Sequence, residues 1–301
     1  MRKSFIALFV AIFAPFFKNY ELFAQKSWEF GLSGGSAVYQ GETNPSYFSL
    51  ETFNAFNPEG GLLLRYNMSS ELSLEANLHY GTLSGNDKDA DTNDRRTRNL
   101  SFKTDIITFG VQANYNLFGF QPFLLEEPFS PYIFVGVEGF HFNPKAEYNG
   151  QWHELQPLGT EGQGMSGRAN KYSLNQLAIP FGFGFRYAVT DRWAIGFEAG
   201  LRKTFTDYID DVGGTYVKSS DLAAKNGQLA ATLANRTGEV GTFIDYRTGS
   251  QRGGRNDDDW YAFTGLTISH IIYDDRLMTG MRRSHTNRKG CPAWKRKKSL
   301  F

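Results

Sequence analysis

Apolar and polar residues alternate with a period of two over stretches of about ten residues, the length at which a tilted strand crosses a bilayer. In the clearest stretch, residues 71–80, every second side chain is apolar: Leu72, Leu74, Ala76, Leu78 and Tyr80. A helix of 3.6 residues per turn cannot keep these side chains on one face and the polar ones on the other, so the pattern predicts a strand. The other predicted strands are 28–39, 57–68, 107–117, 130–143, 179–189, 193–202 and 259–273.

The connections between these strands alternate between short and long. The shortest are 69–70 and 190–191, the one at 119–130 is of middle length, and the long ones are 40–56, 84–99, 144–176 and 208–258. Short periplasmic turns and long extracellular loops are typical of outer-membrane barrels. The predicted fold is therefore all-β, an eight-stranded antiparallel transmembrane β-barrel of OmpA or OmpX size over residues 26–273. An even number of strands returns both chain ends to the periplasm.

The last strand fits two registers. One outward face would carry Trp260, Ala262, Thr264, Leu266 and Ile268, and the other would carry Tyr261, Phe263, Gly265, Thr267 and Ser269. Both sets contain aromatic and apolar residues, so the pattern leaves the register open.

The two predicted faces differ in their chemistry. Aromatic residues near strand ends suit the interfacial girdle of a barrel: Trp28, Tyr66, Tyr80, Tyr187, Trp193 and Trp260. The opposite face carries charged residues, beginning with Glu29 and continuing with Arg65, Glu75, Glu138, Arg186, Glu198 and Arg202. A barrel of eight strands is only wide enough for side chains to fill it. We interpret the charges as an interior network that plugs the barrel; the alternative is the solvated face of a soluble β-protein.

The N-terminal segment, residues 1–25, has the layout of a secretory signal peptide. Arg2 and Lys3 precede an apolar stretch from Phe5 to Phe17, and a polar region follows. The apolar stretch is too short for a membrane-spanning helix and contains Pro15. The mean hydropathy of −0.42 also excludes a polytopic helical membrane protein.

Catalytic and metal-binding motifs are weak. The run from Gly31 to Gly35 matches G-x-S-x-G, but its glycines lie inside a predicted strand, whereas a nucleophile elbow needs a turn and a helix. The acidic segments 207–211 and 256–259 bracket the longest loop and suit calcium, although solvated loop acids are the commoner explanation. No cofactor motif or nucleic-acid platform is recognisable, so we expect a non-enzymatic protein without a cofactor or a nucleic-acid partner.

The C-terminal tail, residues 274–301, carries nine Lys and Arg against two Asp, a net charge of +7, whereas residues 26–273 carry −8. Basic tails bind anionic partners, although a solvated, disordered tail has the same composition. The single cysteine of the chain lies here, which suggests an intermolecular disulfide or an unused thiol. We expect this tail to face the periplasm and to bind a partner through Arg282, Arg283, Cys291, Pro292, Trp294, Lys295 and Arg296.

Several strings resemble the PorG family, outer-membrane β-barrel components of the type IX secretion system of Bacteroidetes. They are GLSGGSAVYQGE at 31–42, ELSL at 71–74, TDYIDD at 206–211 with GTYV at 214–217, and DWY at 259–261 with GLTIS at 265–269. The resemblance covers residues 26–273 and excludes the basic tail. It implies a component of this protein-transport machine that associates with the periplasmic ring of the PorK lipoprotein and PorN.

Three functions follow from these observations. The first is a monomeric barrel, embedded in outer-membrane lipid, that anchors the PorK/PorN ring through its tail, with a disulfide at Cys291 as one means of attachment. The second is a small barrel acting in surface adhesion or ligand binding through loops 144–176 and 208–258. The third, a lipid-modifying enzyme, would need a Ser/His pair near a membrane interface, but His79 is predicted to point inward and His270 lies in the ambiguous strand.

Overall fold

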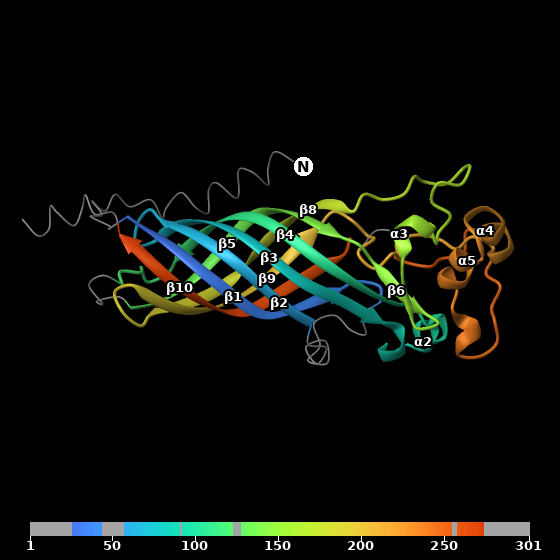
Figure 1. The fold of residues 1–301 in the computed structure, drawn as a ribbon, viewed down its shortest axis with the longest axis horizontal. Helices are drawn as coiled ribbons and strands as arrows, with labels where there is room; N and C mark the ends of the chain where they lie inside the picture. The colour runs from blue at the N-terminus through green and yellow to red at the C-terminus, as the bar shows by residue number, and fades with distance from the viewer. Residues whose placement is uncertain (1–25, 44–56, 91, 123–127, 255–257, 274–301) are drawn as a thin grey trace, which may run out of the picture.

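The computed structural model describes residues 26–43, 57–90, 92–122, 128–254 and 258–273. Eight strands form a closed antiparallel barrel in the order β3-β2-β1-β10-β9-β8-β5-β4, and pairing of β3 with β4 closes it (Figure 1). This confirms the predicted fold class. The strands are β1 (Ser27–Gln40), β2 (Asn57–Asn67), β3 (Leu72–Asn86), β4 (Ser101–Asn116), β5 (Phe129–Phe142), β8 (Asn175–Ala188), β9 (Trp193–Thr204) and β10 (Trp260–Tyr273).

The predicted alternation sets which side chains point into the barrel. On β3, Ser73 and Glu75 are buried in the lumen, while Leu74 and Leu78 are exposed on the outside. The barrel also settles the register of β10, since its apolar outward residues Leu266 and Ile268 are exposed. Tyr261 and Phe263 of that strand point inward and pack in the buried core of the barrel mouth.

The two ends of the barrel differ in the way that the loop lengths predict. One end, here called the turn end, carries the short connections 68–71 and 189–192 and the pairing of Ser27 with Tyr273. The first strand, β1, therefore begins at the turn end, and the last strand, β10, ends there. At the opposite end, β3 and β4 extend several residues beyond their predicted limits, as far as Asn86 and back to Ser101, because they remain paired above the barrel.

The long connections gather at that opposite end into one folded unit, which we call the cap (residues 41–43, 87–100, 143–174 and 205–259, within the described residues) (Figure 1). Its elements are η3 (Asp87–Asp89), α2 (Asn93–Arg98), β6 (Lys145–Tyr148), β7 (Gln151–Glu154), α3 (Leu155–Leu158), α4 (Ser219–Asn226), α5 (Gln228–Ala234) and η4 (Thr237–Glu239). None of the helices in the described part of the chain is long and apolar enough to cross a membrane.

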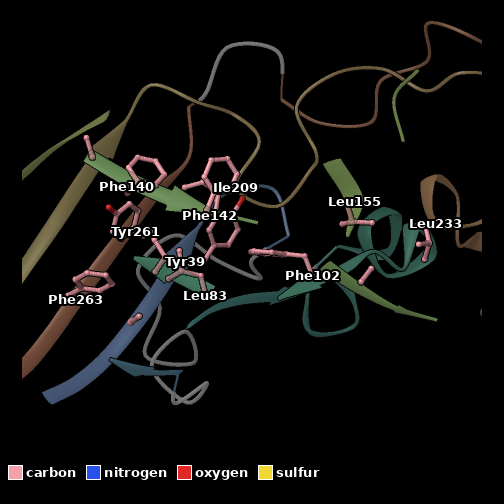
Figure 2. Close-up of a cluster of buried hydrophobic side chains, with 14 residues drawn as sticks. Tyr39, Leu83, Phe102, Phe140, Phe142, Leu155, Ile209, Leu233, Tyr261 and Phe263 are labelled. Atoms are coloured by element: carbon pink, nitrogen blue, oxygen red, sulfur yellow. The ribbon is translucent and has the colours of Figure 1, made fainter. Parts of the chain in front are cut away.

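A hydrophobic core joins the cap to the barrel. Figure 2 shows aromatic side chains from several strands meeting at the barrel mouth, among them Tyr39, Phe102, Phe140 and Tyr261. Tyr39 packs edge-on against Phe102 with ring centroids 4.8 Å apart, and Phe140 packs in the same way against Tyr261 at 5.6 Å. Ile209 of the cap is fully buried in this core. The cap is thus packed onto the barrel by the described parts of the connections.

Candidate functional site

The lumen near the turn end contains a buried network of ion pairs. Arg65 of β2 lies 3.2 Å from Glu29 of β1 and 2.6 Å from Glu75 of β3, and Arg186 of β8 lies 3.0 Å from Glu29 on the other side. These side chains are almost inaccessible to solvent. The side-chain amide oxygen of Asn67 accepts a hydrogen bond of 3.1 Å from the Arg186 guanidinium. The network joins four strands across the interior.

A second group of polar residues lies nearer the cap. Arg202 of β9 is 3.9 Å from Glu138 of β5, and the Tyr261 hydroxyl donates to the same glutamate. Glu198 accepts a hydrogen bond of 2.9 Å from the hydroxyl of Tyr132, whose ring lies 5.4 Å from the Arg65 guanidinium of the first network. All seven residues named from the sequence as interior charges therefore lie inside the barrel: Glu29, Arg65, Glu75, Glu138, Arg186, Glu198 and Arg202.

Sequence reasoning did not identify the pair formed by His79 and Glu59, which also lies in the lumen. The alternation had placed His79 inward, but Glu59 lies at the irregular start of β2. Aromatic rings fill the space around the charges: the Arg186 guanidinium is 3.9 Å from the Phe120 ring centroid, and that of Arg202 is 4.5 Å from the Phe263 centroid. The lumen is thus packed with paired charges and rings.

Two buried arginines hold the cap together. Arg98 of α2 forms an ion pair with Asp87 of η3 and donates to the carbonyl oxygens of Glu42 (3.0 Å) and Arg252 (2.6 Å). Arg252 lies 3.0 Å from the carboxylate of Glu161 and donates to the Asp211 carbonyl oxygen at 2.5 Å. These bonds connect segments that are far apart in the sequence.

Beside these arginines, three carboxylates from distant segments converge. Glu42 follows β1, Asp210 follows β9 and Asp259 precedes β10, and one oxygen from each lies within 4.8 Å of the others. Tyr39 donates to Asp259 (2.5 Å), Thr43 to Asp210 (3.0 Å) and the Gly254 backbone to Glu42 (2.8 Å). We call Glu42, Asp210, Asp259 and the adjacent Asp207 the carboxylate cluster.

The charges of the cluster repel one another in a poorly solvated environment. Burial, together with the neighbouring Asp210, raises the pKa of Glu42 to about 7. Burial, together with the neighbouring Glu42, raises the pKa of Asp207 to about 9. Burial also raises the pKa of Asp210 to about 6, although hydrogen bonds and the charge of Arg98 oppose the rise. Each shift reflects the cost of keeping an anion away from water.

The expectation that these acids are solvated is wrong for three of them. Asp210, Asp211 and Asp259 are 2%, 0% and 0% exposed. They are buried because the ends of the β9–β10 connection fold back over the barrel mouth, where the Asp259 backbone N–H bonds to the Thr206 carbonyl oxygen at 2.9 Å. The sequence indicated the two acidic segments, but nothing in it pointed to Glu42, which lies some 165 residues earlier in the chain.

An open cavity of about 770 Å³ lies next to the cluster. Glu42, Arg98 and Arg252 line it, together with Tyr216 and Tyr246, whose rings are stacked with centroids 4.1 Å apart. The cavity therefore gives a path from the outside to the Glu42 carboxylate.

Other sequence-based predictions have different outcomes. The run from Gly31 to Gly35 lies inside β1, as expected for a coincidental motif. The proposed signal peptide 1–25 lies outside the described residues. So do all the predicted partner-binding residues of the tail: Arg282, Arg283, Cys291, Pro292, Trp294, Lys295 and Arg296.

Comparisons with known proteins identify a family and several distant structures. The family described as a domain of unknown function (DUF6089) matches residues 3–231. No curated protein matches significantly. Among solved structures, Ail, the attachment invasion locus protein of Yersinia pestis, is 8% identical with a TM-score of 0.39, covering 82% of this chain and 99% of Ail.

Two further solved structures are similarly distant. Neisserial surface protein A is 8% identical with a TM-score of 0.39, covering 81% of this chain and 96% of its own. The Escherichia coli outer membrane protein W is 12% identical with a TM-score of 0.32, covering 82% of this chain and 98% of its own. At these identities and TM-scores, none of the three assigns an activity to the chain.

Proposed function

The chain belongs to the DUF6089 family, and we propose that it is an outer-membrane component of the type IX protein secretion system. In this proposal the barrel sits in outer-membrane lipid and anchors the periplasmic PorK/PorN ring through the C-terminal tail. The role is one of attachment and assembly, and the barrel does not conduct the secreted substrate. The PorG-like strings within residues 26–273 supply the connection to this machine.

The observation that carries the anchoring role is the packed lumen. Arg65 and Arg186 bridge Glu29 and Glu75 across the interior, and Tyr132 and Phe134 are buried within it. Opening a passage for a protein substrate would separate buried charges from their partners, which costs about 3–5 kcal/mol for each broken pair. An apolar exterior, with Phe109 and Phe183 exposed, suits a barrel embedded in lipid.

The end of the barrel at which the last strand finishes supports attachment of the ring through the tail. Ser27 and Tyr273 pair at the turn end, away from the cap. In outer-membrane barrels the short turns face the periplasm, so a tail that follows Tyr273 would start on the side of the ring. Its net charge of +7 would then favour an acidic protein surface.

Deletion of residues 274–301 tests the proposal. We expect the truncated barrel to assemble, as judged by heat-modifiable migration on gels, while secretion of type IX cargo and co-purification of PorK and PorN are lost. A tail of the same composition in scrambled order is the matched control. If the scrambled tail restores the ring contact, charge alone suffices; if the deletion leaves secretion intact, the anchoring role is wrong.

The proposed disulfide has its own test. Cys291→Ser should abolish a high-mass band on non-reducing gels if Cys291 is covalently joined to a ring protein. Arg282, Arg283, Lys295 and Arg296 changed together to glutamine would show whether the charges act alongside it. An unchanged gel pattern for Cys291→Ser would exclude the covalent link. The co-purification of PorK and PorN would then test a non-covalent contact alone.

A second function is surface adhesion or ligand binding through the cap. The observation that favours it is that the described parts of connections 143–174 and 205–259 pack into the cap, and that the cap has an open cavity of about 770 Å³, lined by the end of β1, α2 and residues within 205–259. This function predicts that deletion of the tail has little effect, whereas changes in the cavity lining abolish binding to a surface or ligand. The tail deletion therefore separates the two functions.

A further inference from the structure

We propose that the barrel binds one glycolipid of the outer leaflet, with an acyl chain in an apolar groove on its outer wall and the sugar head group in the cavity of the cap. The proposal gives the second function a class of ligand. It rests on the barrel lying in outer-membrane lipid with the cap outward, and it does not involve the tail.

The apolar groove lies on the outer face of β8, β9 and β10, next to the cap, and has a volume of about 600 Å³. Its floor is formed by small outward side chains: Ala199, Ala262 and Thr264. Thr264 pairs with Ala199, and Ala199 pairs with Phe183 of β8, so two small residues lie beside a large one. In the next row toward the turn end, Leu266 pairs with Phe197, and these larger side chains end the groove.

The groove adjoins the open cavity of the cap. Gln40 of β1 and Trp260 of β10 pair with each other and line both hollows. On the groove side, Trp260 packs edge-on against Phe181 with ring centroids 6.1 Å apart. On the cavity side, the Nζ atom of Lys203 lies 5.1 Å from the centroid of the Trp260 ring. A ligand that occupied both hollows would therefore be apolar at one end and polar at the other.

The junction of the two hollows has the composition of a bilayer interface. Tryptophan is enriched in the aromatic girdles of barrels, and lysine keeps its ammonium group in water while its stem covers apolar surface. With Trp260 and Lys203 at this level, the groove faces the hydrocarbon layer and the cavity faces water. The apolar end of the ligand is therefore an acyl chain, and the ligand is a lipid.

The lining of the cavity suits a sugar head group. Four basic and three acidic side chains line it, so it has little net charge with which to select an ion. Sugar hydroxyls both donate and accept hydrogen bonds, and the lining offers partners of both kinds. The stacked rings of Tyr216 and Tyr246 add an apolar surface beside these polar groups. Aromatic side chains with a few polar groups are typical of small-ligand sites, which occupy about 300–1,000 Å³.

A hydroxyl group without a partner points independently to a ligand. Tyr216 lines the cavity and is only 3% exposed. Within the part of the chain that the structure describes, its hydroxyl oxygen makes no hydrogen bond. Buried polar groups are normally hydrogen-bonded, so a hydroxyl of the sugar would supply the partner that the described residues do not.

Native mass spectrometry of the full-length protein tests the proposal, with the protein in micelles of a polyethylene-glycol-ether detergent that carries no sugar. The probe is monophosphoryl lipid A, an acylated glucosamine disaccharide, and it should bind once per barrel and saturate. Phosphatidylethanolamine also carries one phosphate but has no sugar. It should bind at least about tenfold more weakly, because it lacks the hydrogen bonds of the disaccharide.

Ala262→Phe tests the groove. The ring would occupy the floor and displace the acyl chain, and each CH₂ group that loses its apolar contacts lowers affinity about fourfold. We expect a loss of about tenfold or more for lipid A, with unchanged heat-modifiable migration. Ala76→Phe is the matched control, because Ala76 faces outward on β3, away from the groove. It should bind lipid A as the wild type does.

Tyr216→Phe tests the cavity and separates ligand binding from a structural role. It removes only a hydroxyl without a partner, so the cap should resist protease as well as in the wild type. Affinity for lipid A should fall about two- to tenfold, the effect of one hydrogen bond, while affinity for phosphatidylethanolamine stays the same. Tyr148→Phe removes the hydroxyl of a cap tyrosine that does not line the cavity and should leave both affinities unchanged.

The proposal is overturned if lipid A gives no saturable adduct, if phosphatidylethanolamine binds as tightly, or if Tyr216→Phe keeps the wild-type affinity. It is also overturned if Ala76→Phe loses as much affinity as Ala262→Phe. Binding is measured without ring proteins, so a barrel lacking residues 274–301 should bind lipid A like the full chain, whatever the fate of the anchoring role. If lipid A fails while changes in the cavity lining still abolish adhesion, the second function stands and the glycolipid is wrong.

Discussion

Arg98 binds both carboxylate oxygens of Asp87, with its Nε and Nη2 atoms each 2.7 Å from one of them. Asp87 is fully buried and also accepts the backbone N–H of Leu100 at 2.9 Å. Because Arg98 donates further to the carbonyl oxygens of Glu42 and Arg252, this ion pair joins the β3–β4 connection to the end of β1 and to the β9–β10 connection.

Arg98→Met should therefore loosen the cap without preventing assembly of the barrel. It leaves Asp87 buried without a cation, and breaking a buried pair in this way costs about 3–5 kcal/mol. We expect faster proteolysis in residues 205–259 and unchanged heat-modifiable migration. Arg247→Met, which removes an exposed arginine of the β9–β10 connection, should leave the cleavage rate unchanged. Equal effects of the two changes would contradict the role of the Arg98–Asp87 pair.

For the Arg65–Glu75 ion pair of the lumen, we expect a loss of stability that a second substitution partly recovers. Arg65→Met should destabilise the barrel by about 3–5 kcal/mol, because Glu75 then stays buried without a cation. Adding Glu75→Gln should recover at least about 1 kcal/mol, since residues in one ion pair are not additive. The urea concentration at which heat-modifiable migration is lost measures both. A double variant that is less stable than Arg65→Met would count against the pairing.

Two neighbouring glycines of β1 should respond differently to a methyl group. A Cβ at Gly35 would lie 2.0 Å from the Thr264 carbonyl oxygen and 2.4 Å from the Gly265 Cα, whereas a Cβ at Gly34 meets nothing within 4 Å. Gly35→Ala should destabilise the barrel by about 1–3 kcal/mol through overpacking against β10. Gly34→Ala should be neutral or stabilising by about 0.5 kcal/mol, because alanine loses less backbone freedom in a strand. Urea unfolding checks the pair of variants.

We expect the cost of placing an arginine on the outer face of β8 to depend on how deep the position lies in the membrane. Phe183, near the middle of the strand, is 60% exposed, and Leu177, near its cap end, is 65% exposed. An arginine on the lipid side costs about 2–4 kcal/mol at the midplane and about 0–1 kcal/mol near an interface. Phe183→Arg should therefore impair assembly in lipid vesicles much more than Leu177→Arg. Equal folding yields would mean that this face of β8 does not contact the hydrocarbon layer.

Much of the barrel follows from local sequence patterns. The alternation in 71–80 and 179–189 correctly separated outward-facing residues such as Phe183 from lumen residues such as Arg186, because a strand reverses its side chains at every residue. The register of β10 did not follow, since both of its faces carry apolar and aromatic side chains. It depends on Tyr261 and Phe263 fitting the aromatic core of the mouth, which strands far away in the sequence supply.

The packing of the cap could not be predicted from the sequence. The long connections carry no sustained period of two or 3.6, so their lengths were predictable but their packing was not. Arg98 and Arg252 bond to carbonyl oxygens of distant residues, and such contacts have no signature in the residues themselves. The acidic segments 207–211 and 256–259 stood out by composition, yet only the fold shows that Asp210 and Asp259 are buried together.

Local patterns in the sequence were enough to predict the barrel, its eight strands, the outward side of the regularly alternating strands such as 71–80 and 179–189, and the charge difference between residues 26–273 and the tail. These features depend on a residue and its near neighbours, because strand geometry repeats every two residues. The contact of Glu42 with Asp210 and Asp259, and the position of Arg65 between Glu29 and Glu75, became visible only in the folded chain. Those contacts arise when the barrel closes and brings strand ends together, since separation in sequence does not fix separation in space.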